Sequence, residues 1–403
     1  MATKRAFDVI IVGGGIAGSC LAGVLARGGL GVLVVEKEPR FRDRVRGEGT
    51  WPWGVAHALK ASLGELFAQA DVVPIRGQQR FDQRQPVEAN DWAAESVDGV
   101  SEVAFSHAGL QESAFTWAAS HGATTLRPAK ALRFSPHGGP TVTVAQDGRE
   151  VEYRARLVVG ADGKQSGVRR WAGGETEADP EHHRFGGVLI TGARIDDEHD
   201  NYFWEPGFIV NWFAAGAHAS RLYLSMTAER LRETGIDRSF PANITCAAQY
   251  MPEGALDNVE QIGPIGYFPN NDVWASRIAG HDVVLIGDAA GAPDPTQGHG
   301  TSLAFHDVHL LSELLLGEGD WSAATEEFAA QRRDAFAVIR EYDRWHNVIH
   351  SEGADADRLR EGNRRAAQDD PTLGGFNLME ARGPAGLVAD DAARRRYFGD
   401  AVA

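Results

Sequence analysis

Short apolar runs that end in glycine mark the N-terminal part of the chain. The first run covers residues 7–12 and leads into Gly13-Gly14-Gly15. Apolar positions then recur at helical spacing over residues 16–27, and a second apolar run over residues 31–35 ends at Glu36. Because apolar runs bounded by glycines are typical of buried parallel strands, this pattern predicts a strand–helix–strand unit.

The same pattern returns twice, far along the chain. Residues 157–159 lead into Gly160-Ala161-Asp162-Gly163, and residues 282–286 lead into Gly287-Asp288-Ala289-Ala290-Gly291. We expect these runs to join the N-terminal unit in one parallel sheet of an α/β, Rossmann-like domain. Helices are predicted over residues 55–70, 108–121, 302–316 and 321–349, and from Ser166.

Between residues 185 and 268 the pattern changes to short strand-like runs separated by turn residues. Such runs cover residues 187–193, 201–205, 208–213 and 220–226, which predicts an antiparallel sheet inserted into the α/β domain. A polar tail that begins at Ser351 predicts short helices on the surface. We expect an α/β domain of residues 1–76, 98–180 and 273–320, an inserted substrate domain of residues 77–97 and 181–272, and a C-terminal helical region of residues 321–403.

Composition and charge restrict the class of protein. The chain has 403 residues and a net charge of −16, which argues against nucleic acid or an anionic membrane as a partner. We expect neither a signal peptide nor a membrane span, because no apolar run approaches the roughly 18 residues that a span needs, and we expect a cytoplasmic protein. Cys20 and Cys246 form no C-x-x-C pair, so we expect no disulfide framework and no metal site.

The loop after the first strand matches the dinucleotide-binding pattern G-x-G-x-x-G. Gly13 permits a tight turn, Gly15 permits close approach of the backbone to a pyrophosphate, and Gly18 permits close packing of helix and strand. Glu36 ends the next strand, where an acidic side chain binds a ribose hydroxyl. A glycine-rich turn without a ligand is the weaker alternative, because the strand–loop–helix context of the motif is complete.

The two later glycine loops change the expected cofactor. Asp162-Gly163 and Gly287-Asp288 each follow a buried strand, and either one alone is also compatible with an ordinary turn. Asp288 precedes a Pro/Gly loop and a helix start, an arrangement suited to hold a polyol next to free backbone N–H groups. A dehydrogenase that binds only a nicotinamide cofactor has no need of a distant polyol site, whereas the ribityl chain of FAD requires one.

The three motifs, in this order and with the inserted sheet between the last two, resemble those of the group A flavoprotein monooxygenases, the p-hydroxybenzoate hydroxylase type. The resemblance implies an FAD-binding domain in which Asp288 contacts the ribityl chain and the loop from Pro295 to Gly300 runs along the flavin ring. Two positions depart from the family pattern, Ser302 in place of asparagine and His107 in place of arginine. The residues that the resemblance assigns to the cofactor are Gly13, Gly15, Ile16, Ala17, Gly18, Glu36, Lys37, Arg46, Asp162, Gly163, Gly287, Asp288, Pro295, Gly298, His299 and Gly300.

Further residues are candidates for catalysis and for substrate binding. The resemblance places Pro295 near the reactive flavin carbon, and His299 is either a flavin contact or a solvent-facing loop histidine. Residues of the inserted sheet form an aromatic and polar pocket or an ordinary half-buried sheet face: Tyr202, Trp204, Asn211, Arg221 and Tyr223. Alternation places the first two on one face of their strand, and the last two on one face of theirs.

The resemblance implies an FAD-dependent monooxygenase with NADPH or NADH as electron donor, or with a separate flavin reductase as partner. Through a flavin C4a-hydroperoxide, such an enzyme inserts one oxygen atom from O2 into an aromatic or unsaturated small molecule. One alternative is an FAD-dependent reductase of isoprenoid-type double bonds, and another is a non-catalytic FAD-binding scaffold. A halogenase is disfavoured because Trp51-Pro52-Trp53 does not continue as W-x-W-x-x-P.

Overall fold

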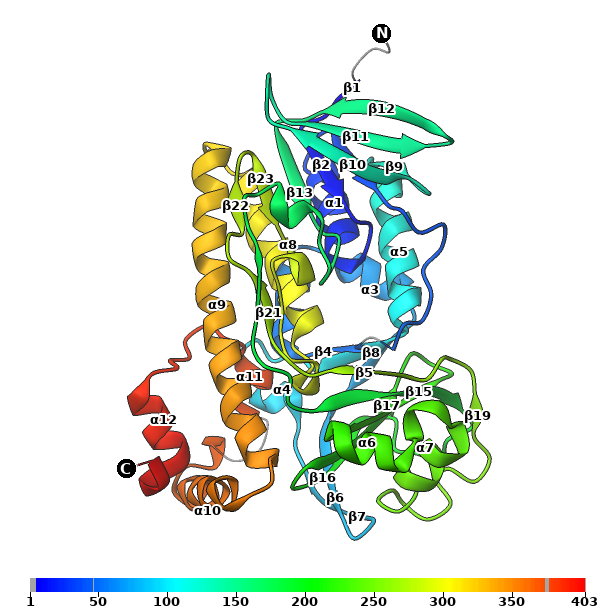
Figure 1. Cartoon of the computed structure of the whole chain (residues 1–403), viewed down its shortest axis with the longest axis vertical. Coiled ribbons are helices and arrows are strands. Elements are labelled where there is room, and N and C mark those ends of the chain that lie inside the picture. Colours follow the sequence, from blue (N-terminus) through cyan, green and yellow to red (C-terminus); the bar gives the residue numbers. More distant parts are fainter. Residues whose placement is uncertain (1–4, 46, 374–376, 403) are drawn as a thin grey trace.

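The computed structural model describes residues 5–45, 47–373 and 377–402. Arg46, one of the predicted cofactor residues, lies outside the described residues. Figure 1 shows an α/β part in the upper half of the view and a second part, rich in antiparallel strands, in the lower half. The long helix α9 (Trp321–His350) runs alongside both parts.

A mainly parallel sheet forms the centre of the upper part, as the apolar runs predict. Its strand order is β22-β23-β13-β2-β3-β9, in which only the β22–β23 pair is antiparallel within the described residues. The helices α1 (Ile16–Arg27), α5 (His107–Ser120) and α8 (Gly300–Leu316) belong to this part, and α1 packs against both others. The strands are β2 (Val9–Val12), β3 (Val32–Val35), β9 (Thr124–Leu126), β13 (Leu157–Gly160), β22 (Ala279–Gly280) and β23 (Val283–Leu285).

Smaller sheets surround this centre. One has the order β1-β12-β11-β10 and comprises β1 (Arg5–Ala6), β10 (Lys130–Ser135), β11 (Thr141–Gln146) and β12 (Arg149–Arg154). A second contains β4 (Gly49–Thr50), β5 (Val72–Ile75) and β8 (Glu102–Phe105). A third contains β14 (Thr176–Ala178), β21 (Val273–Ala275) and β24 (Gly291–Ala292).

The lower part contains the inserted sheet, called the large sheet below. Its order is β19-β15-β18-β17-β16-β6-β7, with β20 also paired to β15, and its pairs are antiparallel except for β16 with β6. One face buries Val188, Val210 and Leu222 beneath α6 (Ala228–Thr234) and α7 (Phe240–Ala247). The strands are β6 (Gly77–Asp82), β7 (Gln85–Ala89), β15 (Arg184–Thr191), β16 (His199–Glu205), β17 (Phe208–Ala214), β18 (Ser220–Met226), β19 (Glu260–Gln261) and β20 (Gly266–Pro269).

Three predicted helices differ from the structure. The helix expected over residues 55–70 is divided into α2 (Pro52–Lys60) and α3 (Gly64–Gln69), because Ser62 adopts a φ of 60° between them. The helix expected from Ser166 is only a 3-10 turn, Val168–Arg170. The tail forms α10 (Ala354–Asp369), α11 (Asn377–Arg382) and α12 (Asp391–Phe398) rather than a surface layer, because Glu380 and Phe398 are buried.

No helix in the described parts of the chain has the length and hydropathy that a bilayer crossing requires. The boundaries between the predicted domains stay a prediction.

Candidate active site

The glycines of the G-x-G-x-x-G loop differ in what surrounds them. Gly13 has a φ of +106°, and a Cβ there would lie 2.2 Å from the carbonyl oxygen of Ala161. A Cβ at Gly18 would lie 2.0 Å from the carbonyl oxygen of Gly13. At Gly15 the nearest atom would be Gln111 Nε2, at 3.6 Å. The first and third glycines therefore permit close packing, while the second faces enough space for a ligand to approach the backbone.

Glu36 lies at the end of β3, beside this loop. Its Oε2 accepts the N–H of Gly14 at 2.7 Å and its Oε1 accepts the N–H of Glu38 at 2.7 Å. Gly15 is the N-cap of α1 and provides no side-chain cap, so the N–H groups at Ile16 and Ala17 belong to an uncapped helix start. Such a start favours anionic ligands. Lys37 follows Glu36 and is exposed.

The Asp162-Gly163 motif shapes its own turn. Asp162 Oδ2 accepts the N–H of Gly167 at 2.8 Å, and Oδ1 accepts the hydroxyl of Ser166 at 2.5 Å. Gly163 has a φ of +83°, a conformation that favours glycine. The carboxylate of Asp162 therefore organises the segment that follows β13, and its predicted contact with the cofactor stays a prediction.

Arg169 joins this turn to the Gly287-Asp288 loop, a role that the sequence motifs do not indicate. Its guanidinium donates to the carbonyl oxygens of Asp288 at 3.2 Å and Ala289 at 3.0 Å, and to that of Lys164 at 3.2 Å. The residue is 2% exposed. No local sequence signal distinguishes it, because the neighbouring Arg170 is also an arginine and is exposed.

A buried ion pair supports the Gly287-Asp288 loop from the other side. Asp307 on α8 accepts the N–H of Gly287 at 2.7 Å through Oδ2, and its Oδ1 lies 2.7 Å from Arg332 Nε on α9. Arg332 also donates to the carbonyl oxygen of Gly291 at 3.0 Å. The loop carrying the half-buried Asp288 is therefore connected to both long helices.

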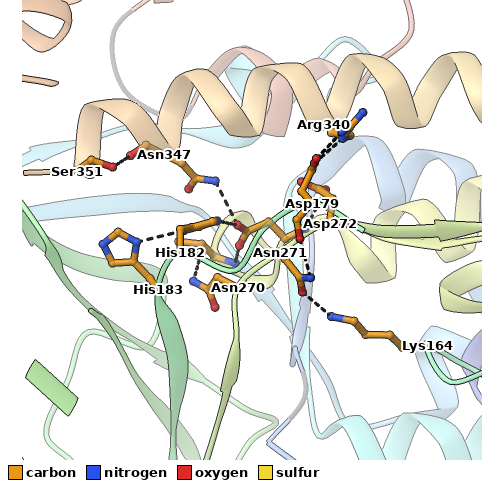
Figure 2. A network of polar contacts seen from close by, with 12 residues as sticks. Lys164, Asp179, His182, His183, Asn270, Asn271, Asp272, Arg340, Asn347 and Ser351 are labelled. Carbon is orange, nitrogen blue, oxygen red and sulfur yellow. Dashed lines mark hydrogen bonds and ion pairs between the residues drawn. The ribbon is translucent and has the colours of Figure 1, made fainter. Parts of the chain in front are cut away.

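The Pro295 loop begins with a carboxylate that has several donors. Asp294 Oδ1 accepts the N–H of Thr296 at 2.8 Å, and Oδ2 lies 2.7 Å from His182 Nε2 and 3.1 Å from Asn347 Nδ2. Figure 2 shows His182 and Asn347 within this network. Burial favours neutral Asp294, but the hydrogen bonds from His182 and Thr296 outweigh it and lower the pKa of Asp294. The loop is thus held by charge-assisted hydrogen bonds.

The end of the same loop opens onto free space and begins a helix. Pro295 is half-buried, Gly298 has a φ of +70°, and α8 starts at Gly300 without a side-chain cap. Among the described residues, no atom lies within 4 Å of a Cβ built on Gly300. The side chain of His299 is buried between Trp53, Asp343 and Glu380.

These features fit an extended dinucleotide such as FAD. Gly15 and Gly300 offer open backbone at the uncapped starts of α1 and α8, where N–H groups favour acceptor oxygens. Glu36 and Asp288 provide carboxylates for hydroxyl groups. The contacts of the individual residues with a cofactor stay predictions.

The five predicted substrate residues share one face of the large sheet. Tyr202 is paired with Asn211, and Asn211 with Tyr223, across three neighbouring strands. Trp204 and Arg221 lie two residues from Tyr202 and Tyr223 on their respective strands, so alternation places them on the same face. This face, called the polar face below, is opposite the one that α6 and α7 cover.

Arg221 and Tyr223 connect the polar face to the loop after β3. Arg221 Nη2 lies 2.6 Å from Glu48 Oε1 and 2.8 Å from Asp43 Oδ1, and the hydroxyl of Tyr223 donates to Glu48 Oε2 at 2.7 Å. Burial raises the pKa of Glu48 to about 7, although Arg221 favours its charged form. Both side chains thus have protein partners, and their contribution to substrate binding stays a prediction.

A cavity lies between the polar face, the Pro295 loop and α9. Ile209 and Ser225 line it from the sheet, Thr296 from the loop, and Asn347 from α9. His350 also lines it, and the ring of Trp204 lies 4.8 Å from the ring of His350. The remaining lining residues are His182, His183, Phe208 and Asn270. The geometry therefore brings the sheet and the predicted flavin loop together around a polar space.

Two of the chain's relatives have names that describe different reactions. The chain is 29% identical over 317 residues to a digeranylgeranylglycerophospholipid reductase of Methanothrix thermoacetophila, covering 76% of this chain and 77% of the relative. It is 24% identical over 365 residues to a squalene epoxidase of Aspergillus fumigatus, covering 82% and 73%.

The fold is shared with p-nitrophenol 4-monooxygenase of Pseudomonas putida, with a TM-score of 0.78, 18% identity, and coverage of 93% of this chain and 96% of that chain. The sequence profile of the FAD binding domain family matches residues 6–326. The chain therefore belongs to the FAD binding domain family and is an FAD-dependent oxidoreductase with the fold of the flavoprotein monooxygenases.

Proposed function

We propose that the protein is an FAD-dependent monooxygenase that inserts one oxygen atom from O2 into a small aromatic or unsaturated molecule. The observation that carries this proposal is the position of the polar face of the large sheet opposite the Pro295 loop. The cavity between them is small, about 10 Å³, which is room for about one water molecule, so a substrate would have to enlarge it. It is lined by hydrogen-bonding side chains, among them Ser225, Asn270 and Asn347, together with Phe208 and Ile209. Such a lining suits a compact molecule that carries polar groups on an apolar framework.

The residues around the cavity would orient the substrate and exclude water. Asp294, His182 and Asn347 hold the loop that forms one wall, and α9 closes the side next to Trp204. When bound, FAD supplies the redox chemistry, accepting electrons from a nicotinamide and activating O2. The protein's own contribution is a preorganised, poorly hydrated site.

We further propose NADPH or NADH as the electron donor. Reduced nicotinamides are the typical electron donors of the flavoprotein monooxygenases that the chain resembles. In that family the Asp162-Gly163 motif supports binding of the nicotinamide. A separate flavin reductase is the alternative source of electrons. Stopped-flow reduction of the holoenzyme by NADPH and by NADH separates these models, because turnover only with added reduced flavin would exclude direct reduction.

A second candidate is reduction of an isoprenoid-type double bond, which the methanogen relative's name favours. The lining of the cavity argues against it. A long isoprenoid chain requires extended apolar surface, whereas His182, His183 and Asn270 present polar atoms to this space. We therefore rank oxygen insertion first.

The decisive experiment is turnover under 18O2 with mass spectrometry of the products. The holoenzyme would receive NADPH and a panel of phenols, anilines and isoprenoid lipids. A product containing one 18O atom supports the monooxygenase, and a product that has gained two hydrogen atoms without 18O supports the reductase. If neither product forms and neither nicotinamide nor a flavin reductase reduces the bound FAD, the protein is a non-catalytic scaffold.

A further inference from the structure

Buried carboxyls extend from the large sheet to the Pro295 loop. Each is at most 5% exposed, and each has a pKa raised by burial. Electrostatic interactions connect them in sequence, from Asp200 to Glu102, to Glu380, to Asp343 and to Asp272. Because burial penalises the charged form, this series of groups favours the protonated form.

His299 lies at the centre of this series, on the loop predicted to run along the flavin. Its Nε2 is 3.2 Å from Asp343 Oδ1 and 3.9 Å from Glu380 Oε1, and the three side chains are at most 2% exposed. Among the described residues, neither ring nitrogen of His299 has a hydrogen-bond partner, nor have Asp343 Oδ2 and both carboxyl oxygens of Glu380, so the contact of 3.2 Å is close without being a formed hydrogen bond. A buried polar atom without a partner is costly, so these atoms require an explanation beyond packing.

The surroundings of the cluster place it between solvent and the predicted substrate face. The charge of Asp294 acts to raise the pKa of both His299 and Asp343. In the same way, the charge of Glu380 acts to raise the pKa of three further groups, Glu102, Tyr202 and Tyr397. From α2, Trp53 faces the imidazole with a ring separation of 6.3 Å. Tyr202 is one of the predicted substrate residues, so the cluster reaches from the loop to the polar face.

A connection to solvent exists at the opposite end. The N–H of Asp294 donates to Asp272 Oδ1 at 3.1 Å, and His182 Nε2 lies 2.7 Å from Asp294 Oδ2. His182 exposes 34% of its side chain. These contacts join the partly exposed His182 to Asp294 and Asp272, and both carboxyl groups interact electrostatically with Asp343.

The charge balance of the cluster permits proton movement without a net buried charge. Burial lowers the pKa of His299 and raises that of Glu380 to about 8, so the resting cluster holds a neutral imidazole beside protonated carboxyls. If Asp343 passes its proton to His299 Nε2 while Nδ1 gives its proton to the group that is protonated in turnover, the imidazole stays neutral. The carboxylate left on Asp343 regains a proton from its neighbours, and only O–H and N–H bonds are formed or broken.

We propose that His299, Asp343 and Glu380 form a proton relay that supplies the proton consumed in each turnover. The inference rests on the proposed function in one respect, since oxygen insertion converts NAD(P)H, H+, O2 and substrate into NAD(P)+, water and product. Reduction of a double bond by NAD(P)H consumes a proton as well. Asp343 and Glu380 lie beyond the family match at residues 6–326, so the C-terminal helices provide this function. Asp343 and Glu380 are positioning residues that act through His299.

Infrared spectroscopy tests the protonation directly and requires no substrate. The holoenzyme at neutral pH should show absorption from protonated carboxyls, and Asp343→Asn and Glu380→Gln should each remove part of it. Reduction of the bound FAD by dithionite should perturb the same absorption, and His299→Asn should abolish that perturbation. Glu361→Gln is the matched control, because Glu361 is an exposed carboxylate paired with Arg364 and should contribute nothing.

Kinetics distinguish a relay from a structural role. Loss of a proton donor typically costs about 100-fold or more in rate, so Asp343→Asn should slow NADPH-dependent oxygen consumption by roughly that factor. The rate of the wild-type protein should fall as the pH rises through about 8, the pKa of Glu380, and Glu380→Gln should remove this decline. Asp343→Glu should restore most of the rate.

Two results would overturn the relay. One is a wild-type infrared spectrum without protonated-carboxyl absorption, or with absorption that Asp343→Asn and Glu380→Gln leave unchanged. The other is a decline above pH 8 that persists in Glu380→Gln, which would show a merely structural role. The infrared measurement needs only FAD and dithionite, so it stays interpretable if no 18O-labelled product is found.

Discussion

Backbone groups form most of the predicted cofactor half of the site, whereas buried side-chain charges hold the half that faces it. At the loop after β2, the decisive features are the φ of Gly13 and the open space at Gly15. Around the Pro295 loop and the neighbouring Gly287-Asp288 loop, they are the carboxylates of Asp294 and Asp307, which face His182 and Arg332. Where backbone groups form the site, most side chains larger than that of glycine would clash with the fold or with the ligand. Where buried charged side chains form the site, its stability depends on each charge having an opposite charge beside it.

This contrast implies different responses to substitution. In the backbone half, adding a methyl group should act through steric clash or through exclusion of the ligand. In the side-chain half, removing one partner should leave a buried charge and destabilise the whole chain. Both responses are measurable as free energies of unfolding and as affinity for FAD.

The largest effect is expected at the ion pair that supports the Gly287-Asp288 loop. Arg332→Met leaves Asp307 buried without its cation and should lower the free energy of unfolding by about 3–5 kcal/mol. Urea unfolding followed by circular dichroism measures the loss. Arg333→Met on the same helix is the control, because Arg333 is exposed and should change stability by less than about 0.5 kcal/mol. Equal losses in the two variants would contradict the proposed support.

The G-x-G-x-x-G loop provides the next test, with separate substitutions at two of its glycines. Gly13→Ala places a Cβ 2.2 Å from a backbone oxygen at a positive φ, so it should destabilise the fold by about 2–4 kcal/mol. Gly15→Ala has room and a φ of −67°, so the fold should persist while FAD binds at least about tenfold more weakly. Fluorescence titration of the apoprotein with FAD measures the affinity. Unchanged FAD affinity in Gly15→Ala would refute the assignment of this glycine to the cofactor.

The same contrast explains what the sequence reveals and what it conceals. The strands β2, β3, β13 and β23 were predictable because apolar runs and glycines act locally. The break between α2 and α3 was missed because the helical periodicity of residues 55–70 outweighed the weak turn signals of Ser62 and Gly64. Glu380 lies in a polar tail that indicates surface exposure, and it becomes buried only through contacts made by distant residues.

Ion pairs between residues that are far apart in the chain could not be predicted either. Asp307 and Arg332 lie on separate helices, and periodicity indicates which face they occupy but not which charge they meet. The alternation along each strand correctly placed Tyr202 with Trp204 and Arg221 with Tyr223. That all of them share the polar face follows from the register between strands, which the spacing within one strand cannot determine.

A smaller effect is expected where Arg221 joins the polar face to the loop after β3. Arg221→Met should cost about 2–3 kcal/mol of stability, because Glu48 and Asp43 lose their cation. Glu48→Gln combined with Arg221→Met should cost less than the sum of the single changes, since neither charge is then left facing an absent partner. A double-mutant cycle by urea unfolding measures the coupling, and strictly additive losses would show that the contact of 2.6 Å contributes nothing.

The smallest effect concerns the pH dependence of stability at Glu380, which distinguishes a protonated carboxyl from the charged pairs discussed above. Burial raises its pKa from 4.5 to about 8, so its contribution to stability is complete below pH 4.5 and disappears as the pH rises through 8. Between pH 6 and 7, the free energy of unfolding of the wild type should therefore fall, relative to Glu380→Gln, by about 1.4 kcal/mol at most. Glu361→Gln should show no such change, because the exposed Glu361, with a pKa of about 2, is charged in both conditions. If the difference between wild type and Glu380→Gln were constant over this interval, Glu380 would be ionised in the folded protein, and the buried half of the site would consist of charged groups throughout.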